Sequence, residues 1–224
     1  MKHTRSKLFD YSFLSVGLLI QVVTYVITNH FSPDALSPLS LVSGLLGICS
    51  VCLAAQGNIW TYLFGFGQVG TYTWLCLQQR LYGEVAINAY YFLTMIYGVY
   101  VWRRRLTDKD AYTVTTRTLR TVHFLLIAAA AVLLSYLVGF GLERWTDDTQ
   151  PYLDAFTTIP ALVAQVLMIL VYREHWYIWL AVDILSVVMW LRAGDYCMTA
   201  QYAFWCCNCV YGFICWRRSD GGTR

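Results

Sequence analysis

The chain has 224 residues, of which 58% are hydrophobic and only 13% are charged, and its formal net charge is +3. Soluble globular domains carry about 25% charged residues, so this composition excludes an ordinary soluble domain and indicates an integral membrane protein. The lipid bilayer is therefore the expected partner, and no nucleic-acid partner is expected.

Eight apolar segments are long enough to cross a hydrocarbon core about 30 Å thick, which takes about 20 helical residues. In chain order they are residues 11–28, 36–55, 59–77, 85–102, 119–142, 153–172, 176–191 and 196–216. The basic start of the chain leads into the first segment without a small-residue cleavage site, which predicts a membrane crossing rather than a cleaved signal peptide. Short connections between the segments leave little room for catalytic machinery outside the membrane.

The positions of lysine and arginine predict the orientation, because basic residues are enriched in cytoplasmic loops. With the first residues inside, the cytoplasmic segments hold most of them: Lys2, Arg5, Lys7, Arg103, Arg104, Arg105, Lys109, Arg117, Arg120, Arg173, Arg217 and Arg218. The outer loops then hold only Arg80, Arg144 and Arg192. This distribution predicts a multi-pass protein with both termini in the cytoplasm.

An internal repeat links the fourth and eighth segments. Residues 97–104, with the sequence YGVYVWRR, end the fourth segment, and residues 211–218, YGFICWRR, end the eighth. Both copies end on the predicted cytoplasmic side, so the repeats are parallel and the fifth segment connects them. The predicted fold is an all-α integral membrane protein, a parallel repeat of two three-helix bundles joined by a linker helix (3+1+3) plus one extra N-terminal helix. The predicted divisions are residues 1–35 for the N-terminal segment and extra helix, 36–105 for the first bundle, 106–150 for a cytoplasmic loop and the linker helix, 151–218 for the second bundle and 219–224 for the tail.

The seventh segment carries the most informative pattern in the chain. Asp183 lies in its middle, where a carboxylate is costly and needs water, a partner or a cationic ligand. Trp176, Trp179, Asp183 and Trp190 share one helical face, and indole rings attract cations. We interpret Trp176 and Trp179 as stacking groups for a planar ring, and Asp183 as an acceptor for hydroxyl groups or a balance for positive charge. The alternatives are tryptophans of the membrane interface, which we favour for Trp190, and a structural carboxylate.

Amide side chains mark further positions at membrane depth. Gln201, Trp205 and Asn208 share one face of the eighth segment, Asn88 and Tyr91 share a face of the fourth, and Gln68 and Gln165 lie in the middle of the third and sixth. Amides both donate and accept hydrogen bonds, so they match a substrate that carries a carboxamide. The alternative is that they bridge neighbouring helices, at about 1 kcal/mol or less each.

The WxxWxxxD spacing of the penultimate helix, together with the duplicated Tyr-Gly…Trp-Arg-Arg closure, resembles the PnuC-type bacterial vitamin transporters. The resemblance covers residues 36–218. It implies a fold like that of the SWEET sugar exporters, a homotrimer, and a place in the bacterial cytoplasmic (inner) membrane. It also implies facilitated diffusion of nicotinamide riboside for NAD biosynthesis, with trapping through phosphorylation by a cytoplasmic kinase that forms no required complex with the transporter. No catalytic residue, cofactor or metal is implied, and the family often has Asn at the position of Asp183, which leaves the exact vitamin open.

Other classes of membrane protein fit the sequence less well. A retinal photoreceptor needs a buried lysine, and Lys2, Lys7 and Lys109 all lie outside the predicted spans. An intramembrane enzyme needs a nucleophile–base pair or metal ligands at depth, which one isolated carboxylate does not supply. Two alternatives stay open: transport of thiamine or another vitamin or nucleoside by the same fold, and a non-transporting membrane sensor or structural bundle.

Overall fold

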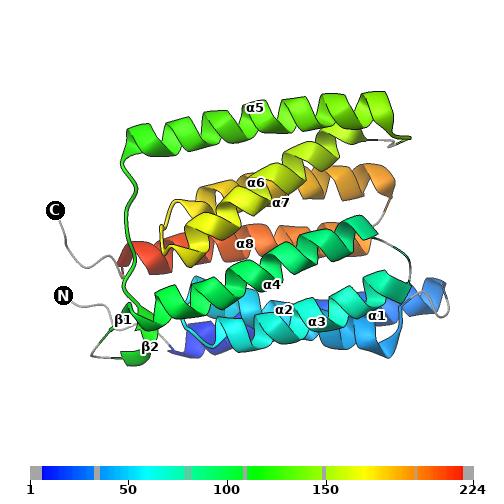
Figure 1. Ribbon diagram of the computed structural model, residues 1–224. Coiled ribbons are helices and arrows are strands. Elements are labelled where there is room, and N and C mark those ends of the chain that lie inside the picture. Colours follow the sequence, from blue (N-terminus) through cyan, green and yellow to red (C-terminus); the bar gives the residue numbers. More distant parts are fainter. Residues whose placement is uncertain are drawn as a thin grey trace.

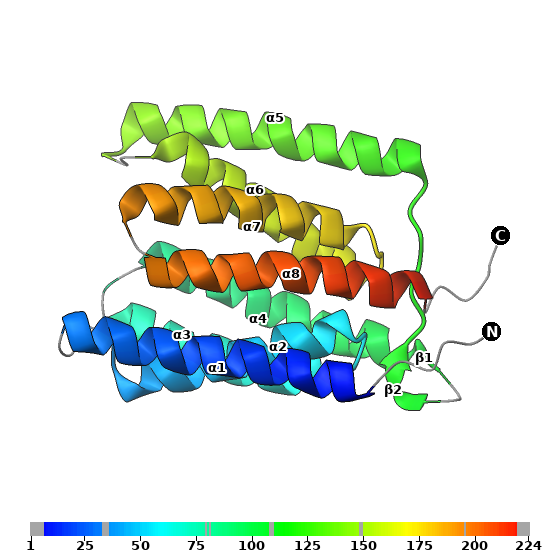
Figure 2. The ribbon, with the colours of Figure 1, turned by 180° about the vertical axis from the view of Figure 1, so that it is seen from behind.

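The computed structural model describes residues 7–32, 36–78, 80, 82–107, 110–147, 150–194 and 196–218. The described elements are α1 (Lys7–Phe31), α2 (Pro38–Ala55), α3 (Thr61–Gln78), α4 (Tyr82–Arg103), β1 (Leu106–Thr107), β2 (Asp110–Val114), α5 (Thr121–Trp145), α6 (Pro151–Ile169), α7 (His175–Ala193) and α8 (Tyr196–Arg218). Each of the eight predicted segments is a helix. The helices run side by side in one bundle, with α1 and α5 at opposite sides and the two strands at the end where α1 begins and α8 ends (Figures 1 and 2).

The all-α prediction is confirmed, and the connection between α4 and α5 adds a short hairpin that was not predicted. The strands β1 and β2 pair antiparallel, with Leu106 opposite Val114. This connection is predicted as a loop because it is too short and polar to cross the membrane, yet residues 112–116 read YTVTT, and β-branched and aromatic residues favour strands. Val114 is fully buried and its amide donates to the carbonyl of Gly57 at 3.0 Å. The extended segment that follows runs across the end of the bundle to α5 (Figure 1).

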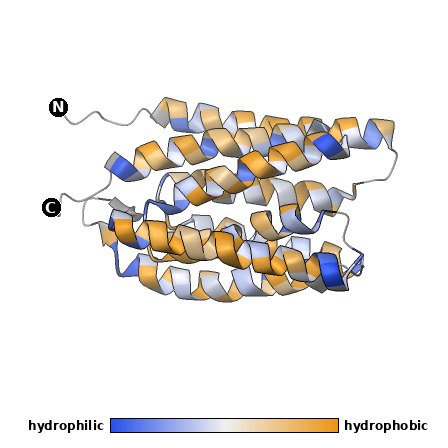
Figure 3. Ribbon diagram, turned by 90° about the horizontal axis from the view of Figure 1, so that it is seen from above, coloured by the Kyte–Doolittle hydropathy of each residue, from blue (hydrophilic) through white to orange (hydrophobic). Residues whose placement is uncertain are grey.

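Five of the described helices are long and apolar enough to cross a membrane: α1, α2, α4, α5 and α6. Many large apolar side chains of α5 face outward, among them Leu125, Leu133 and Leu137, which are more than half exposed. This is the surface expected of a helix in contact with lipid. Hydrophilic residues are most frequent toward the helix ends (Figure 3).

The helices α3, α7 and α8 fall outside that group because aromatic, hydroxyl and amide side chains replace aliphatic ones. In α7 and α8 the polar groups point inward: Asp183, Ser186 and Asn208 are all buried. A helix with polar groups on its inner face has lower mean hydropathy than one that meets lipid on all sides, although it lies in the same bundle. The three helices of lower hydropathy therefore supply much of the polar interior.

Helix packing brings distant parts of the chain together. The helices α2, α3 and α4 pack on one another in that order and form one group, and α6, α7 and α8 form a second group in the same way. Contacts between α2 and α8 and between α4 and α6 join the two groups. The helix α5 packs on α6, and α1 packs on α2 and α8. The main buried cluster extends across both groups and contains the indoles of Trp102, Trp176 and Trp216.

Candidate binding site

Asp183 lies in the interior of the bundle, on α7, with its side chain only 5% exposed. The thiol of Cys209, on α8, donates a hydrogen bond to its Oδ2 at 3.2 Å. Within the described part of the chain, no lysine or arginine forms an ion pair with it. A thiol is a weak donor, and a carboxylate offers about four acceptor positions, so most of the hydrogen-bonding capacity of Asp183 stays available.

The two predicted stacking residues lie inside the bundle, one turn from each other on α7. Trp176 is 4% exposed, and its ring centroid lies 4.4 Å from that of His175 and 6.0 Å from that of Trp216. A Cβ atom on Gly212 of α8 would come within 2.5 Å of the Trp176 ring, so the absent side chain at Gly212 lets the helix approach the indole. Trp179 is partly buried against the same core cluster. Both indoles therefore face neighbouring helices, unlike residues of an outer interface belt.

The inner face of α8 presents polar atoms that the described protein does not satisfy. The amide nitrogen of Asn208 donates to the carbonyl of Val51, on α2, at 3.3 Å. Its Oδ1 is buried without a hydrogen-bond partner among the described residues, as are Nε1 of Trp205 and Nε1 of Trp176. A buried polar group without a partner costs about 1–3 kcal/mol, and such groups in a native fold call for an explanation such as a ligand or water. Gln201, one turn from Trp205, is half-buried.

The remaining predicted residues lie on α3, α4 and α6 and differ in their surroundings. The Asn88 amide donates to Glu84 in its own helix at 2.8 Å, and Gln165 donates to the hydroxyl of Thr94 at 3.4 Å. Gln165 thus bridges α6 and α4, which is the structural alternative given for the amides. Tyr91 and Gln68 are half-buried, Tyr91 against the core cluster and Gln68 beside Gly47 of α2.

Sequence reasoning missed several residues at the end of this interior. Trp102 and Trp216, the tryptophans of the duplicated closure, are not among the predicted site residues, yet both are fully buried, with ring centroids 5.8 Å apart. His175 is also not among the predicted site residues, and its ring is fully buried between Trp176 and Trp216. The repeated Tyr-Gly…Trp-Arg-Arg sequence at the ends of α4 and α8 is the signal from which this buried tryptophan pair could have been predicted. Among the described residues, no group of three or more His, Cys, Asp or Glu side chains is placed to hold a metal ion.

An apolar helical bundle whose interior holds a buried acid, indole rings, and amide and indole atoms without a described partner defines a class: a multi-pass membrane protein with a polar interior. Comparisons with known proteins make the assignment narrower. A sequence profile of the family described as "Nicotinamide mononucleotide transporter" matches residues 37–218. The chain belongs to this family of membrane transporters, whose members are not enzymes.

The similar proteins cover nearly the whole chain. The nicotinamide riboside transporter PnuC of Neisseria mucosa is 32% identical over 220 residues, which are 94% of this chain and 81% of that protein. The nicotinamide riboside transporter PnuC of Haemophilus influenzae is 29% identical over 215 residues, 95% of this chain and 91% of that protein. A crystal structure described as that of the vitamin B3 transporter PnuC matches with a TM-score of 0.76 at 32% identity, covering 94% of this chain and 91% of that one. These matches confirm the resemblance to PnuC-type transporters.

Proposed function

We propose that this protein carries nicotinamide riboside across the bacterial cytoplasmic membrane by facilitated diffusion. The observation that carries the proposal is the buried carboxylate of Asp183, which faces α8 and has only a thiol as a described hydrogen-bond partner. Nicotinamide riboside combines a cationic pyridinium ring, a carboxamide and a ribose with free hydroxyl groups. A buried acid beside indole rings complements such a molecule, because the acid balances the charge and the ring faces attract it.

The proposed roles follow the placement of each side chain. Trp176 and Trp179 stack on the pyridinium ring, and Asp183 balances its charge or accepts ribose hydroxyl groups. Asn208 and Trp205 offer a free acceptor and a free donor on the adjacent helix, which matches a carboxamide, since a carboxamide both donates and accepts. The remaining members of the proposed site are Asn88, Tyr91, Gln68, Gln165 and Gln201.

We also propose that residues 36–218 form two parallel repeats of three helices, with α5 as the linker. Two indole hydrogen bonds support this. Trp216 at the end of α8 donates to the carbonyl of Ala54 in α2 at 2.9 Å, and Trp102 at the end of α4 donates to the carbonyl of Met168 in α6 at 3.3 Å. The sequence distance from Trp102 to Trp216 equals that from Ala54 to Met168. The last helix of each proposed triplet is therefore hydrogen-bonded to the first helix of the other triplet at equivalent positions.

The turns after α2 and α6 support the same symmetry. Gly57 and Val171 follow these helices at the same repeat spacing, and both have a φ of 67°. A β-branched residue in this left-handed region is strained. The segment formed by β2 and the extended residues after it is hydrogen-bonded to both positions. Val114 donates its amide to Gly57 at 3.0 Å, and Arg117 donates to Val171 at 2.8 Å. A single connector is thus bonded to the equivalent turn of each proposed repeat.

The proposed orientation places the end with β1 and β2 in the cytoplasm. That end holds the larger group of described arginines: Arg103, Arg104, Arg105, Arg117, Arg120, Arg173 and Arg217. Arg80, Arg144 and Arg192 lie in or beside the connections at the other end. Because cytoplasmic loops are rich in lysine and arginine, this asymmetry supports cytoplasmic termini. We further propose that the chain forms a homotrimer and that a cytoplasmic kinase traps the substrate, since phosphorylation adds negative charge without a complex between the two proteins.

Calorimetric titration of the purified full-length protein with nicotinamide riboside, thiamine and riboflavin tests the proposal. Wild-type protein is expected to bind nicotinamide riboside, and Trp179→Ala and Asp183→Ala are expected to weaken that binding. Equal binding by wild type and both variants would remove the proposed site. Binding of thiamine without binding of nicotinamide riboside would keep the site and change the substrate.

A further inference from the structure

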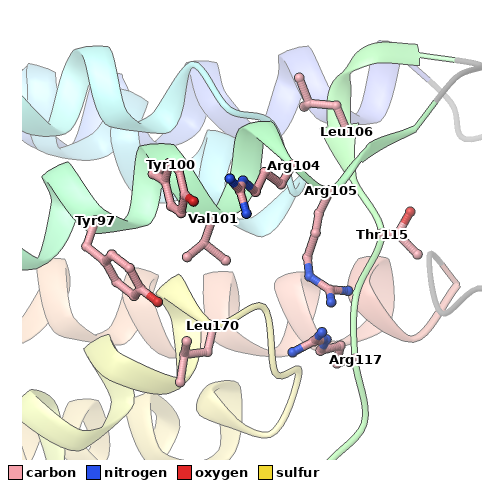
Figure 4. A pocket seen from close by; sticks show the side chains of 9 residues that line it. All are labelled: Tyr97, Tyr100, Val101, Arg104, Arg105, Leu106, Thr115, Arg117 and Leu170. Atoms are coloured by element: carbon pink, nitrogen blue, oxygen red, sulfur yellow. The ribbon is translucent and has the colours of Figure 1, made fainter.

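A cavity, lined by none of the residues proposed for the substrate, opens near the end of the bundle that carries the strands. It has a volume of about 530 Å³ and lies between the end of α4, the end of α6 and the extended segment after β2 (Figure 4). Three arginines line it: Arg104, Arg105 and Arg117. Tyrosines 97 and 100 and three aliphatic side chains form the rest of its wall together with a threonine.

The charges in this cavity are of one sign. Arg105 and Arg117 come from different segments, and their guanidinium groups point toward one another (Figure 4). The guanidinium of Arg104 lies over the ring of Tyr100, 4.2 Å from its centroid. Among the described residues, no aspartate or glutamate lines the cavity. Like charges that face one another repel, and an anion between them relieves the repulsion.

The equivalent surface of the other proposed repeat has different neighbours. Tyr211 is the counterpart of Tyr97 in the duplicated closure. Its hydroxyl donates to the carboxylate of Asp10, on α1, and the ring of Phe13 from the same helix lies 4.9 Å away. The helix α1 therefore covers that surface and supplies a negative charge. Beside Tyr97 the described chain supplies arginines instead of a carboxylate, so an anion from outside the described chain would complete the same kind of charge pairing.

We propose that this cavity binds a phosphate group, carried either by an anionic phospholipid or by a soluble phosphate compound. Guanidinium groups bind phosphate in a bidentate manner, and two of them from different segments are placed to hold one group. The geometry also provides for an acyl chain, because Val101, Leu106 and Leu170 line the same cavity and Tyr97 is about half exposed. Basic pockets between membrane helices on the cytoplasmic side are suited to anionic lipid head groups.

Native mass spectrometry of the full-length protein, with mixtures of phosphatidylglycerol and phosphatidylcholine, tests the lipid source. Titration of the same protein with inorganic phosphate and with adenosine monophosphate tests the soluble source. The test variant is Arg105→Gln with Arg117→Gln, and Arg105→Lys with Arg117→Lys keeps the charge but loses the bidentate geometry. The matched control is Arg103→Gln, which removes an exposed arginine from the same run without altering the cavity wall.

Phosphatidylglycerol is expected to bind at least tenfold more tightly than phosphatidylcholine in wild type and in Arg103→Gln, with the preference lost in the double glutamine variant. A pocket-dependent affinity for phosphate or adenosine monophosphate alone supports the site and assigns the soluble source. Should the glutamine variant fold poorly, a lysine variant with intermediate affinity still supports the site. No preference for either source in wild type, or equal losses in Arg103→Gln and the double variant, overturns the proposal. Neither outcome depends on binding of nicotinamide riboside.

Discussion

The substitution Asp183→Asn separates a ligand-binding carboxylate from a structural one. The amide keeps the shape of the side chain and an oxygen that can accept from Cys209 at the observed 3.2 Å. The change removes the negative charge, which is buried at 5% exposure without a described cationic partner, and replaces the other acceptor oxygen with an NH₂ donor. A hydrogen bond or pairing with a charged group contributes about 1.5–3 kcal/mol. We therefore expect affinity for nicotinamide riboside to fall by roughly 10- to 150-fold.

A neutral ligand makes this measurement specific. The reduced form, dihydronicotinamide riboside, keeps the ribose and carboxamide but has an uncharged ring. Calorimetric titration of both ligands should show that wild type prefers the cationic form and that Asp183→Asn loses this preference. The matched control is Glu143→Gln, which changes an exposed acid at the end of α5 that contacts Tyr152. Equal losses for both ligands, or an unchanged affinity for the cationic form, would refute the charge-balancing role.

The melting temperature of the ligand-free protein provides a second readout of the same substitution. A buried charge without an ionic partner costs several kcal/mol, whereas a buried amide costs less. If Asp183 is retained for a ligand, Asp183→Asn should leave the melting temperature unchanged or raise it. A structural carboxylate predicts the reverse, because the substitution would weaken the bond that joins α7 to α8.

Three further substitutions test the surroundings of Asp183. Trp179→Ala should weaken binding of the cationic ligand by about 30-fold in a fluorescence titration, since a desolvated cation–π contact contributes about 2 kcal/mol; an unchanged affinity would remove Trp179 from the site. Gly212→Ala should destabilise the fold by about 1–3 kcal/mol and displace Trp176, because its new Cβ would lie 2.5 Å from the indole. The control Gly70→Ala has no neighbouring atom within 4 Å and should be neutral or stabilising in the same denaturation assay. Trp216→Phe should lower stability by about 1 kcal/mol or more through loss of the hydrogen bond to α2; an unchanged unfolding midpoint would show that this closure is not important.

The sequence was sufficient to predict the helices, because length and apolar content determine where a chain crosses a bilayer. It was also sufficient to place Asp183 and Trp176 in the interior, because a carboxylate at membrane depth is costly in contact with lipid and Trp176 shares the helical face of Asp183. The strands β1 and β2 were missed because a short polar connection was judged by hydropathy alone. The hairpin and the segment after it are also hydrogen-bonded to Gly57 and Val171, which are distant in sequence.

Hydrogen-bond partners between helices could not be predicted from the periodicity of one helix. The bond from Cys209 to Asp183 depends on the relative rotation of α7 and α8. The cavity beside Arg105 and Arg117 depends on how the connector crosses the end of the bundle. Both arginines had been counted only as orientation signals. A charge count gives the side of the membrane, but only the folded chain shows which charges face one another.

Uptake of labelled nicotinamide riboside into liposomes that contain only the purified protein is the decisive test of facilitated diffusion. We expect saturable uptake that stops when the internal and external concentrations are equal, without any ion gradient or kinase. Asp183→Asn should lower the initial rate at limiting substrate, whereas Glu143→Gln should match wild type. Uptake no faster than into empty liposomes, or accumulation above the external concentration, would contradict facilitated diffusion of this vitamin.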